Sequence, residues 1–220
     1  SGLGLELNLR GLLNRVRRLL GLAPIRNVYT HLVTRVLLAA DPELAPIPAD
    51  ADRPGHQTGY WHLRPKETLP SRLERFLARG SRPVFIGFGS MGDPEPWRTA
   101  EAVERAVRAA GVRAVVQSGW GGLRVAASDR VLPVSGRLPH ARLFPRMAAV
   151  VHHGGAGTVM TAARAGAPQV VAPHLLDQYY WARRIQCLGL GPAPLSRRCL
   201  DARQLAAALR RVVEDGGSCT

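Results

Sequence analysis

Residues 148–159, AAVVHHGGAGTV, decide the fold class. The run Ala148–Val151 is short and apolar, as buried strands are. The segment His152–Thr158 follows it with three glycines and opens a helix that we expect to reach about Ala165. A strand that turns through glycines directly into a helix is the repeating unit of a parallel α/β sheet.

The same alternation extends over residues 71–215 at short spacing. It predicts a Rossmann-like parallel sheet with helices on both faces, in which ligands bind beyond the carboxyl ends of the strands. Asp201 is the expected N-cap of the last helix. The other predicted strands are Pro83–Gly87, Val112–Gln117, Val131–Val134 and Gln169–Ala172, and the other predicted helices are Ser71–Arg79, Trp97–Ala110, Leu176–Leu188 and Asp201–Asp215.

The first third of the chain has a different character. Residues 7–20 form an amphipathic helix with leucines on one face and arginines on the other. It is either a surface helix packed on a domain or a membrane-surface helix, and its aliphatic face without Trp favours the first. Val36–Ala40 and His56–Trp61 are candidate short strands. We expect residues 63–70, with two prolines, to link a domain at 1–62 to the domain at 71–215.

The chain of 220 residues carries a formal net charge of +14, nearly all of it from arginine, because Lys66 is the single lysine. This charge is either compositional or directed at an anionic partner. We expect no nucleic-acid partner, since the arginines are scattered and no basic stripe with interleaved aromatic residues occurs.

Three cysteines stand far apart without a CxxC pair, so we expect neither a metal site nor a disulfide framework, and a reducing cytoplasm as the compartment. No apolar run is long enough to span a bilayer, so we expect no stable membrane insertion. The chain begins at Ser1 rather than Met, and we expect it to be a processed or truncated piece.

Three segments with chemical potential follow predicted strands. Gly87–Gly92 contains Ser90, whose hydroxyl can contact a phosphate, although an ordinary tight turn has the same composition. Pro173–Gln178 ends in an acid and an amide that suit vicinal sugar hydroxyls, although Asp177 could also be a simple helix N-cap.

The third segment is His152–Thr158, which gives the most specific indication. A helix N-terminus offers free N–H groups and the positive end of a dipole. The glycines leave space for a pyrophosphate, and His153 and Thr158 add donors to the same anion. The segment therefore predicts a phosphate-binding turn.

Gly136–Gly191 as a whole resembles the donor-binding signature of family 1 glycosyltransferases of the bacterial antibiotic, sterol and flavonoid type, which have the GT-B fold. The segments GYW (59–61), VFIGFGSM (84–91) and SGWGGL (118–123) resemble the same family at the same spacing. The resemblance covers about residues 55–215 and, more loosely, the helix 7–20. It implies a nucleotide-sugar-binding domain at 71–215 and a remnant of the N-terminal acceptor domain at 1–62.

The resemblance also implies roles for ten residues. The residues that would hold the diphosphate are Ser90 and His153, with the amides of Gly155, Gly157 and Thr158; those beside the nucleobase are Trp120, Leu138 and His140; and those on the donor sugar are Asp177 and Gln178. Trp120 and Leu138 could instead be buried core residues. Arg137 and Thr161 replace the base-stacking Trp and the ribose-binding Glu of plant members, so UDP and dTDP both stay open.

The implied reaction is inverting transfer of a hexose from a UDP- or dTDP-sugar to a hydroxyl of a lipophilic small molecule, without a metal or another cofactor. Family members take their general base from the N-terminal domain, and nothing around His31 or His56 marks either as that base. We therefore expect no catalytic base in this chain, an acceptor bound through the missing domain, and no transfer by the chain alone.

Three other interpretations are open. One is a degenerate homologue kept for interaction, and the intact HHGGAGT (152–158) and DQ (177–178) motifs argue against it. A different GT-B enzyme, such as an epimerase or a MurG-like transferase, is disfavoured by PHLLDQYYWARR (173–184). A non-catalytic donor-binding subunit or partner module would instead complete a separate acceptor-binding chain.

Overall fold

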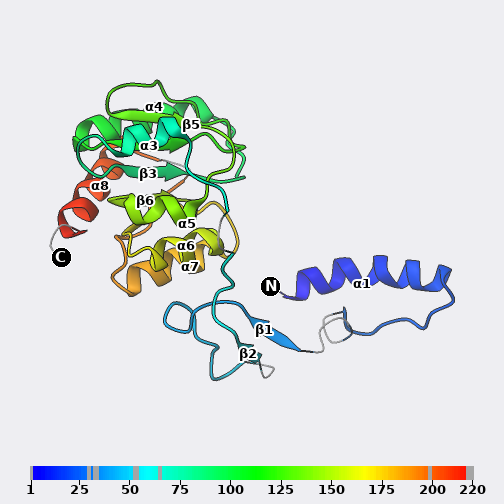
Figure 1. Cartoon of the computed structure of the whole chain (residues 1–220). Helices are drawn as coiled ribbons and strands as arrows, with labels where there is room; N and C mark the ends of the chain where they lie inside the picture. The colour runs from blue at the N-terminus through cyan, green and yellow to red at the C-terminus, as the bar shows by residue number, and fades with distance from the viewer. Residues whose placement is uncertain are drawn as a thin grey trace. The chain divides into compact units, whose positions relative to one another are not determined.

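Two units make up the chain, Ser1–Trp61 and His62–Thr220. The computed structural model describes residues 2–28, 31, 35–51, 55–63, 66–197 and 200–216, with the backbone alone at 2–8 and 215–216 (Figure 1). The predicted linker 63–70 lies at the start of the second unit, and two of its residues, 64 and 65, fall outside the described ranges. The assignment of the first unit to an acceptor domain stays a prediction.

The first unit contains helix α1 (Gly2–Leu19) and two short strands, β1 (Val36–Leu38) and β2 (Gly55–Gln57). The strands pair in parallel, with Val36 opposite Gly55. Both are shorter than predicted. The side chain of Gln57 ties the intervening loop to β2, because its Nε2 donates to the backbone oxygens of Ala40 (2.8 Å) and Ala45 (2.9 Å).

The second unit is built on a five-stranded parallel sheet in the order β5-β4-β3-β6-β7. Its strands are β3 (Val84–Gly87), β4 (Ala114–Gln117), β5 (Val131–Val134), β6 (Ala149–His152) and β7 (Gln169–Val171). Each predicted strand is present. The predicted Rossmann-like fold class is confirmed.

Helices connect the strands and cover the sheet. They are α3 (Ser71–Leu77), α4 (Pro96–Ala110), α5 (His140–Leu143), the 3₁₀ turn η1 (Phe144–Arg146), α6 (Ala156–Arg164), α7 (Gln178–Cys187) and α8 (Ala202–Gly216). α4 ends at Gly111 in the left-handed conformation (φ 69°), as a C-terminal glycine allows. The N–H of Arg203 donates to Asp201 Oδ1, which fits the predicted cap. α5 and η1 were not predicted.

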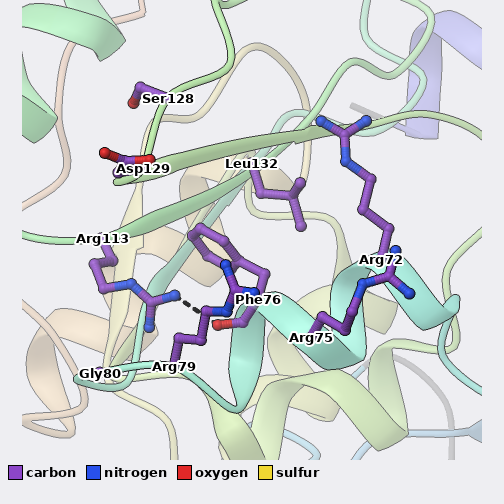
Figure 2. Close-up of a pocket in the computed structure, with 9 residues that line it drawn as sticks. All are labelled: Arg72, Arg75, Phe76, Arg79, Gly80, Arg113, Ser128, Asp129 and Leu132. Carbon is purple, nitrogen blue, oxygen red and sulfur yellow. Dashed lines mark hydrogen bonds between the residues drawn. The ribbon is translucent and has the colours of Figure 1, made fainter.

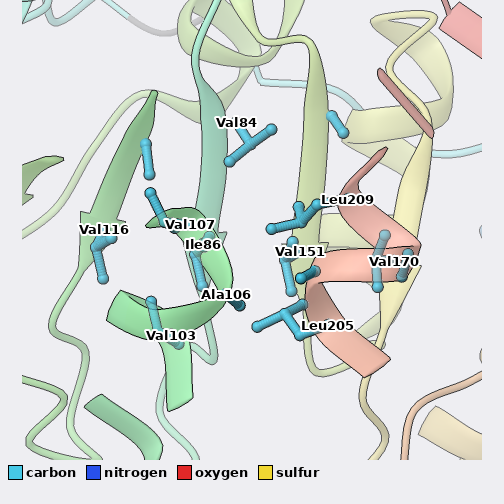
Figure 3. Packing of buried hydrophobic residues seen from close by; sticks show 14 of the residues in the cluster. Val84, Ile86, Val103, Ala106, Val107, Val116, Val151, Val170, Leu205 and Leu209 are labelled. Atoms are coloured by element: carbon cyan, nitrogen blue, oxygen red, sulfur yellow. The ribbon is translucent and has the colours of Figure 1, made fainter. Parts of the chain in front are cut away.

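Alternate residues of the central strand point to opposite faces of the sheet. Val84 and Ile86 belong to a core beneath α4 and α8, where Leu205 and Leu209 are completely buried (Figure 3). Phe85 belongs to a second core beneath α3, α5 and η1. Helices therefore bury both faces of the sheet, which explains the continuous apolar runs in its strands.

The strand order places a topological switch point between β3 and β6. The chain moves outward from β3 through β4 to β5 and then returns to β6 on the other side of β3. The loops that leave β3 and β6 diverge at this point, and parallel α/β sheets bind ligands in the crevice that forms there.

Candidate functional site

The ten predicted site residues lie on the five loops or helix starts that follow the strands, at the carboxyl edge of the sheet. Direct contacts connect the loops after β3, β4, β6 and β7, and the loop after β5 is held through the end of β4. The sequence prediction that they share one edge is therefore met by the fold. Their individual environments differ in burial and in hydrogen bonding.

His153 is half-buried directly after β6, between two glycines. A Cβ atom at Gly89 (φ +62°) would stand 2.8 Å from His153 Cε1, and one at Gly155 would stand 2.6 Å from His153 Nε2. A side chain at either position would therefore displace the imidazole ring. The loop after β3 and the turn after β6 meet on this one side chain.

The Nδ1 atom of His153 is buried and has no hydrogen-bond partner in the described part of the chain. Buried polar atoms are normally paired, so an orphaned one marks a place for a ligand or water. Burial lowers the pKa of His153, and the charge of Asp177 opposes that shift. The ring is consequently a neutral hydrogen-bonding group near pH 7.

The N-terminus of α6 opens beside this ring. Gly155 is its N-cap residue in extended conformation. The Thr158 amide already donates to Gly155 O at 3.0 Å, whereas the amides of Gly155 and Gly157 donate to no acceptor within the described residues. First-turn amides of this kind, with the helix dipole, suit an anion.

Glycines in the loop after β4 bring it against the loop after β3. A Cβ at Gly119 would overlap the Gly89 oxygen, and one at Gly121 would overlap the Met91 oxygen. The Trp120 amide donates to Gly89 O at 3.2 Å, while its indole is 86% exposed. The interpretation of Trp120 as a buried core residue is therefore wrong. Its exposed side chain could contact a nucleobase. Ser90 is exposed on the same loop as Gly89.

Leu138 and His140 face inward rather than toward solvent. Leu138 is buried in the second core, so the core interpretation holds for its side chain. Only the backbone of its loop could then contact a nucleobase. His140 stacks on Phe144 (4.6 Å between centroids) and its Nε2 lies 3.1 Å from Gln117 Oε1. Burial lowers the pKa of His140 to about 4. Gln117, which was not predicted, also donates to Gly136 O and thus positions this loop.

Asp177 and Gln178 divide into an exposed acid and a buried amide. Asp177 makes no side-chain cap bond, so the simple N-cap interpretation is not realised; its Oδ2 instead accepts from Trp181 Nε1 at 3.1 Å. Gln178 Oε1 accepts from the amides of His174 (2.8 Å) and Leu175 (3.2 Å). In this arrangement Gln178 shapes the loop, and Asp177 is the residue that presents oxygen atoms to solvent.

A buried polar network behind the site was not predicted. Arg197 forms an ion pair with Asp93, and its Nε donates to His174 Nε2 at 2.9 Å. Thr99 Oγ1 donates to Asp93 at 2.7 Å. His174 Nδ1 lies 3.0 Å from the oxygen of Ala172, so the ring is held as a neutral donor and acceptor; burial, with the charge of Arg197, lowers its pKa to about 4. The network fixes the loop after β7 to the loop after β3.

His152 is the structural partner of His153. It is completely buried, its Nδ1 accepts from the Gly154 amide (3.0 Å), and its Nε2 lies 2.9 Å from Gln169 Oε1. An accepting Nδ1 requires the hydrogen on Nε2, so the ring is neutral. Burial lowers its pKa to about 3. His152 therefore shapes the turn that carries His153.

Two kinds of feature are absent from the described ranges. These ranges contain no group of three or more His, Cys, Asp or Glu side chains arranged to hold a metal ion. They also contain no helix that is both long and apolar enough to cross a membrane.

Similar proteins agree with this architecture. Residues 100–219 match the family model of the erythromycin biosynthesis protein CIII-like C-terminal domain. A vancomycin aglycone glucosyltransferase of Amycolatopsis orientalis is 44% identical over 188 residues, which are 83% of this chain and 44% of the relative. A sterol 3-beta-glucosyltransferase of Arabidopsis thaliana is 36% identical over 210 residues, 90% of this chain and 34% of the relative.

Solved structures give the same result. The glycosyltransferase VinC in complex with dTDP matches 83% of this chain and 45% of its own, with TM-score 0.62 and 26% identity. The spinosyn rhamnosyltransferase SpnG complexed with thymidine diphosphate matches 84% of this chain and 50% of its own, with TM-score 0.60 and 25% identity.

The fold is that of the C-terminal half of a GT-B glycosyltransferase. The chain belongs to the family of erythromycin biosynthesis protein CIII-like C-terminal domains, whose relatives include antibiotic and sterol glycosyltransferases. It spans less than half of the length of the curated relatives described above.

Proposed function

We propose that this chain binds the donor of an inverting glycosyltransferase, a UDP- or dTDP-hexose, in the crevice between the loops after β3 and β6. The observation that carries the proposal is the buried, unpartnered Nδ1 of His153 beside the open N-terminus of α6. The two structural neighbours that contain thymidine diphosphate support a nucleoside diphosphate as ligand.

The geometry divides the work among few residues. His153 and the free amides of Gly155 and Gly157 would hold the diphosphate, with Ser90 at its edge. Exposed Trp120 would lie against the base. Asp177 would accept hydrogen bonds from sugar hydroxyls. Gln178 and Leu138 would act indirectly, by shaping the loops.

The reaction would be a direct displacement. An acceptor hydroxyl oxygen bonds to the anomeric carbon while the bond from that carbon to the diphosphate breaks. The proton of the hydroxyl passes to a general base that we place outside this chain, and negative charge grows on the departing diphosphate. Preorganised amides and a neutral imidazole donor stabilise that charge without a metal ion.

We extend the proposal to the acceptor and to the state of the isolated chain. The names of the relatives, a vancomycin aglycone and a sterol glucosyltransferase, support a hydroxyl of a lipophilic small molecule as acceptor. The isolated chain would bind donor nucleotide and transfer no sugar. The cytoplasmic location rests on the cysteine pattern alone.

Calorimetric titration with UDP and with dTDP tests the donor site. We expect one nucleotide to bind, and His153→Ala to weaken it by about tenfold or more, since a charge-assisted hydrogen bond is lost. His56→Ala, an exposed histidine of the first unit, is the matched control and should retain affinity. Equal affinity of the His153→Ala variant and the wild-type chain would overturn the assignment.

A turnover assay with UDP- and dTDP-glucose and a panel of phenols and macrolides tests the proposal that the isolated chain transfers no sugar. Robust transfer by the isolated chain would show that it carries its own base. Transfer that appears only when a separate acceptor-binding chain is added would instead favour the partner-module interpretation.

A further inference from the structure

A second hollow in the molecule lies at the opposite edge of the sheet from the donor site. It has a volume of about 480 Å³ and is lined by Arg72, Arg75, Phe76, Arg79, Gly80, Arg113, Ser128, Asp129 and Leu132 (Figure 2). Gly80, Arg113 and Asp129 precede β3, β4 and β5, whereas the donor-site residues follow those strands. Strands of four residues separate the two places by roughly 13 Å. We call this hollow the arginine pocket.

The arginine pocket has a net positive charge. Its lining contains four arginines and one acid, Asp129. No ion pair within the described residues joins Asp129 to any of the four. The acid of α3, Glu74, is bound to Arg146 at 2.7 Å instead. Like charges gathered without counter-charge destabilise a fold unless an anion is bound.

Arg113 is fixed as the inner wall of the pocket. Its guanidinium lies over the Phe76 ring at 4.1 Å from the centroid and donates to the backbone oxygen of Phe76 (Figure 2). It also donates to the backbone oxygen of Ser81. Burial lowers its pKa. A guanidinium has five N–H donors, so Arg113 retains donors for a further acceptor after these two bonds.

Arg72, Arg75 and Arg79 approach from α3 and the turn after it. Positions three and four residues apart share one side of a helix. The side chains of all three are exposed, and among the described residues none of them forms a side-chain hydrogen bond or an ion pair. From Arg72 to Arg75 the helix rises by roughly 4.5 Å, and Arg79 follows in the turn after α3. A ligand with several anionic groups can meet more of these separate guanidinium groups at once than a single small anion can.

We propose that the arginine pocket binds a ligand that carries two or more phosphate groups. Arginine is the side chain best suited to phosphate, because its planar donors bind two oxygens at once. The volume falls in the range of small-molecule sites, about 300–1,000 Å³, and exceeds what one phosphate ion fills. A soluble polyphosphorylated molecule and a surface of lipid phosphates offer the same chemistry.

Titration with tripolyphosphate tests the proposal on the whole 220-residue chain, in the presence of excess UDP or dTDP so that the donor site is occupied. The double variant Arg75→Ala/Arg79→Ala should bind tripolyphosphate about tenfold or more weakly. The matched control, Arg105→Ala/Arg108→Ala, removes the same charge from the exposed face of α4 and should bind as the wild-type chain does. No loss in the first variant, or an equal loss in the control, would overturn the proposal.

Cosedimentation with phosphatidylcholine vesicles, with and without phosphatidylglycerol, distinguishes the two sources. Binding to the phosphatidylglycerol vesicles that is lost in Arg75→Ala/Arg79→Ala would assign the pocket to lipid phosphates. Tripolyphosphate binding without vesicle binding would assign it to a soluble ligand. Nucleotide affinity should be unchanged in this variant, so failure of the arginine pocket and failure of the donor site give different results.

Discussion

His152 and His153 are adjacent in the chain, but the fold gives them opposite tasks. His152 has both ring nitrogens bonded inside the protein, to Gly154 and Gln169. His153 has one buried nitrogen without a partner in the described residues. A strand places successive side chains on opposite faces, so neighbouring residues at its end enter different environments. One ring therefore builds the turn, and the other is the ring that we propose contacts the diphosphate.

The first prediction at this scale concerns Gly89. Gly89→Ala places a Cβ 2.8 Å from His153 and a non-glycine residue at φ +62°. The left-handed conformation costs about 1–2 kcal/mol, and the displaced ring should weaken nucleotide binding by about tenfold. Gly92→Ala is the control in the same loop, because nothing lies within 4 Å of its Cβ position. Calorimetry and urea unfolding measure the two effects, and equal behaviour of the two variants would argue against the role of Gly89.

Metal dependence is the second prediction at the residue scale. If the amides of the α6 N-terminus and a neutral His153 hold the diphosphate as proposed, EDTA should leave the affinity for the nucleotide unchanged. The measurement is calorimetry with EDTA or with added Mg²⁺. Affinity that rises strongly with Mg²⁺ would count against His153 and the helix terminus as the charge-stabilising groups.

At the scale of elements, helix α8 closes one face of the sheet. It packs against α4 and against β6 and β7, and Leu209 is completely buried among them (Figure 3). Leu209→Ala should lower the free energy of unfolding by about 2–5 kcal/mol, as cavities at such sites do. Arg203→Ala, exposed on the same helix, should change it by less than about 0.5 kcal/mol. Urea unfolding followed by circular dichroism compares them, and a small effect of Leu209→Ala would show that α8 can move into the cavity.

The elements also show how far sequence reasoning reaches. Continuous apolar runs such as Pro83–Gly87 predicted buried parallel strands, and the structure has a strand there at Val84–Gly87, because both faces of the sheet are covered. The short α5 and η1 were missed, since a four-residue helix and a three-residue turn at 140–146 are too short to show helical periodicity. The candidate site followed from residues adjacent in sequence. Gln117, whose partners lie about 20 residues away, has no local signal and was missed for that reason.

At the scale of the whole molecule, the chain combines a large positive charge with three buried or half-buried histidines, His140, His152 and His174. Burial lowers the pKa of His140 and of His174 to about 4 and that of His152 to about 3, against an ordinary value of 6.5. The chain already carries +14 with its histidines neutral. Each proton that these rings accept on unfolding therefore favours the unfolded chain, in which the charge is hydrated and spread out.

This arrangement predicts acid lability. A histidine with a lowered folded-state pKa binds more protons when unfolded, so its contribution is complete above pH 6.5 and is lost as pH falls from 6.5 toward 4. Between about pH 7 and about pH 5, His140 and His152 should each remove about 1–2 kcal/mol of stability. Burial raises the pKa of Asp93, but bonds from Thr99, the Glu95 backbone and Arg197 lower it below its ordinary 3.8. The stabilising contribution of Asp93 is therefore lost only at lower pH, below 3.8.

Urea unfolding at several pH values measures how steeply stability depends on pH. His140→Gln, which can still bond Gln117 but cannot titrate, should lower stability at pH 7 and make the slope shallower. A wild-type stability that is constant between about pH 7 and about pH 5 would mean that the folded protein opens enough to hydrate these rings.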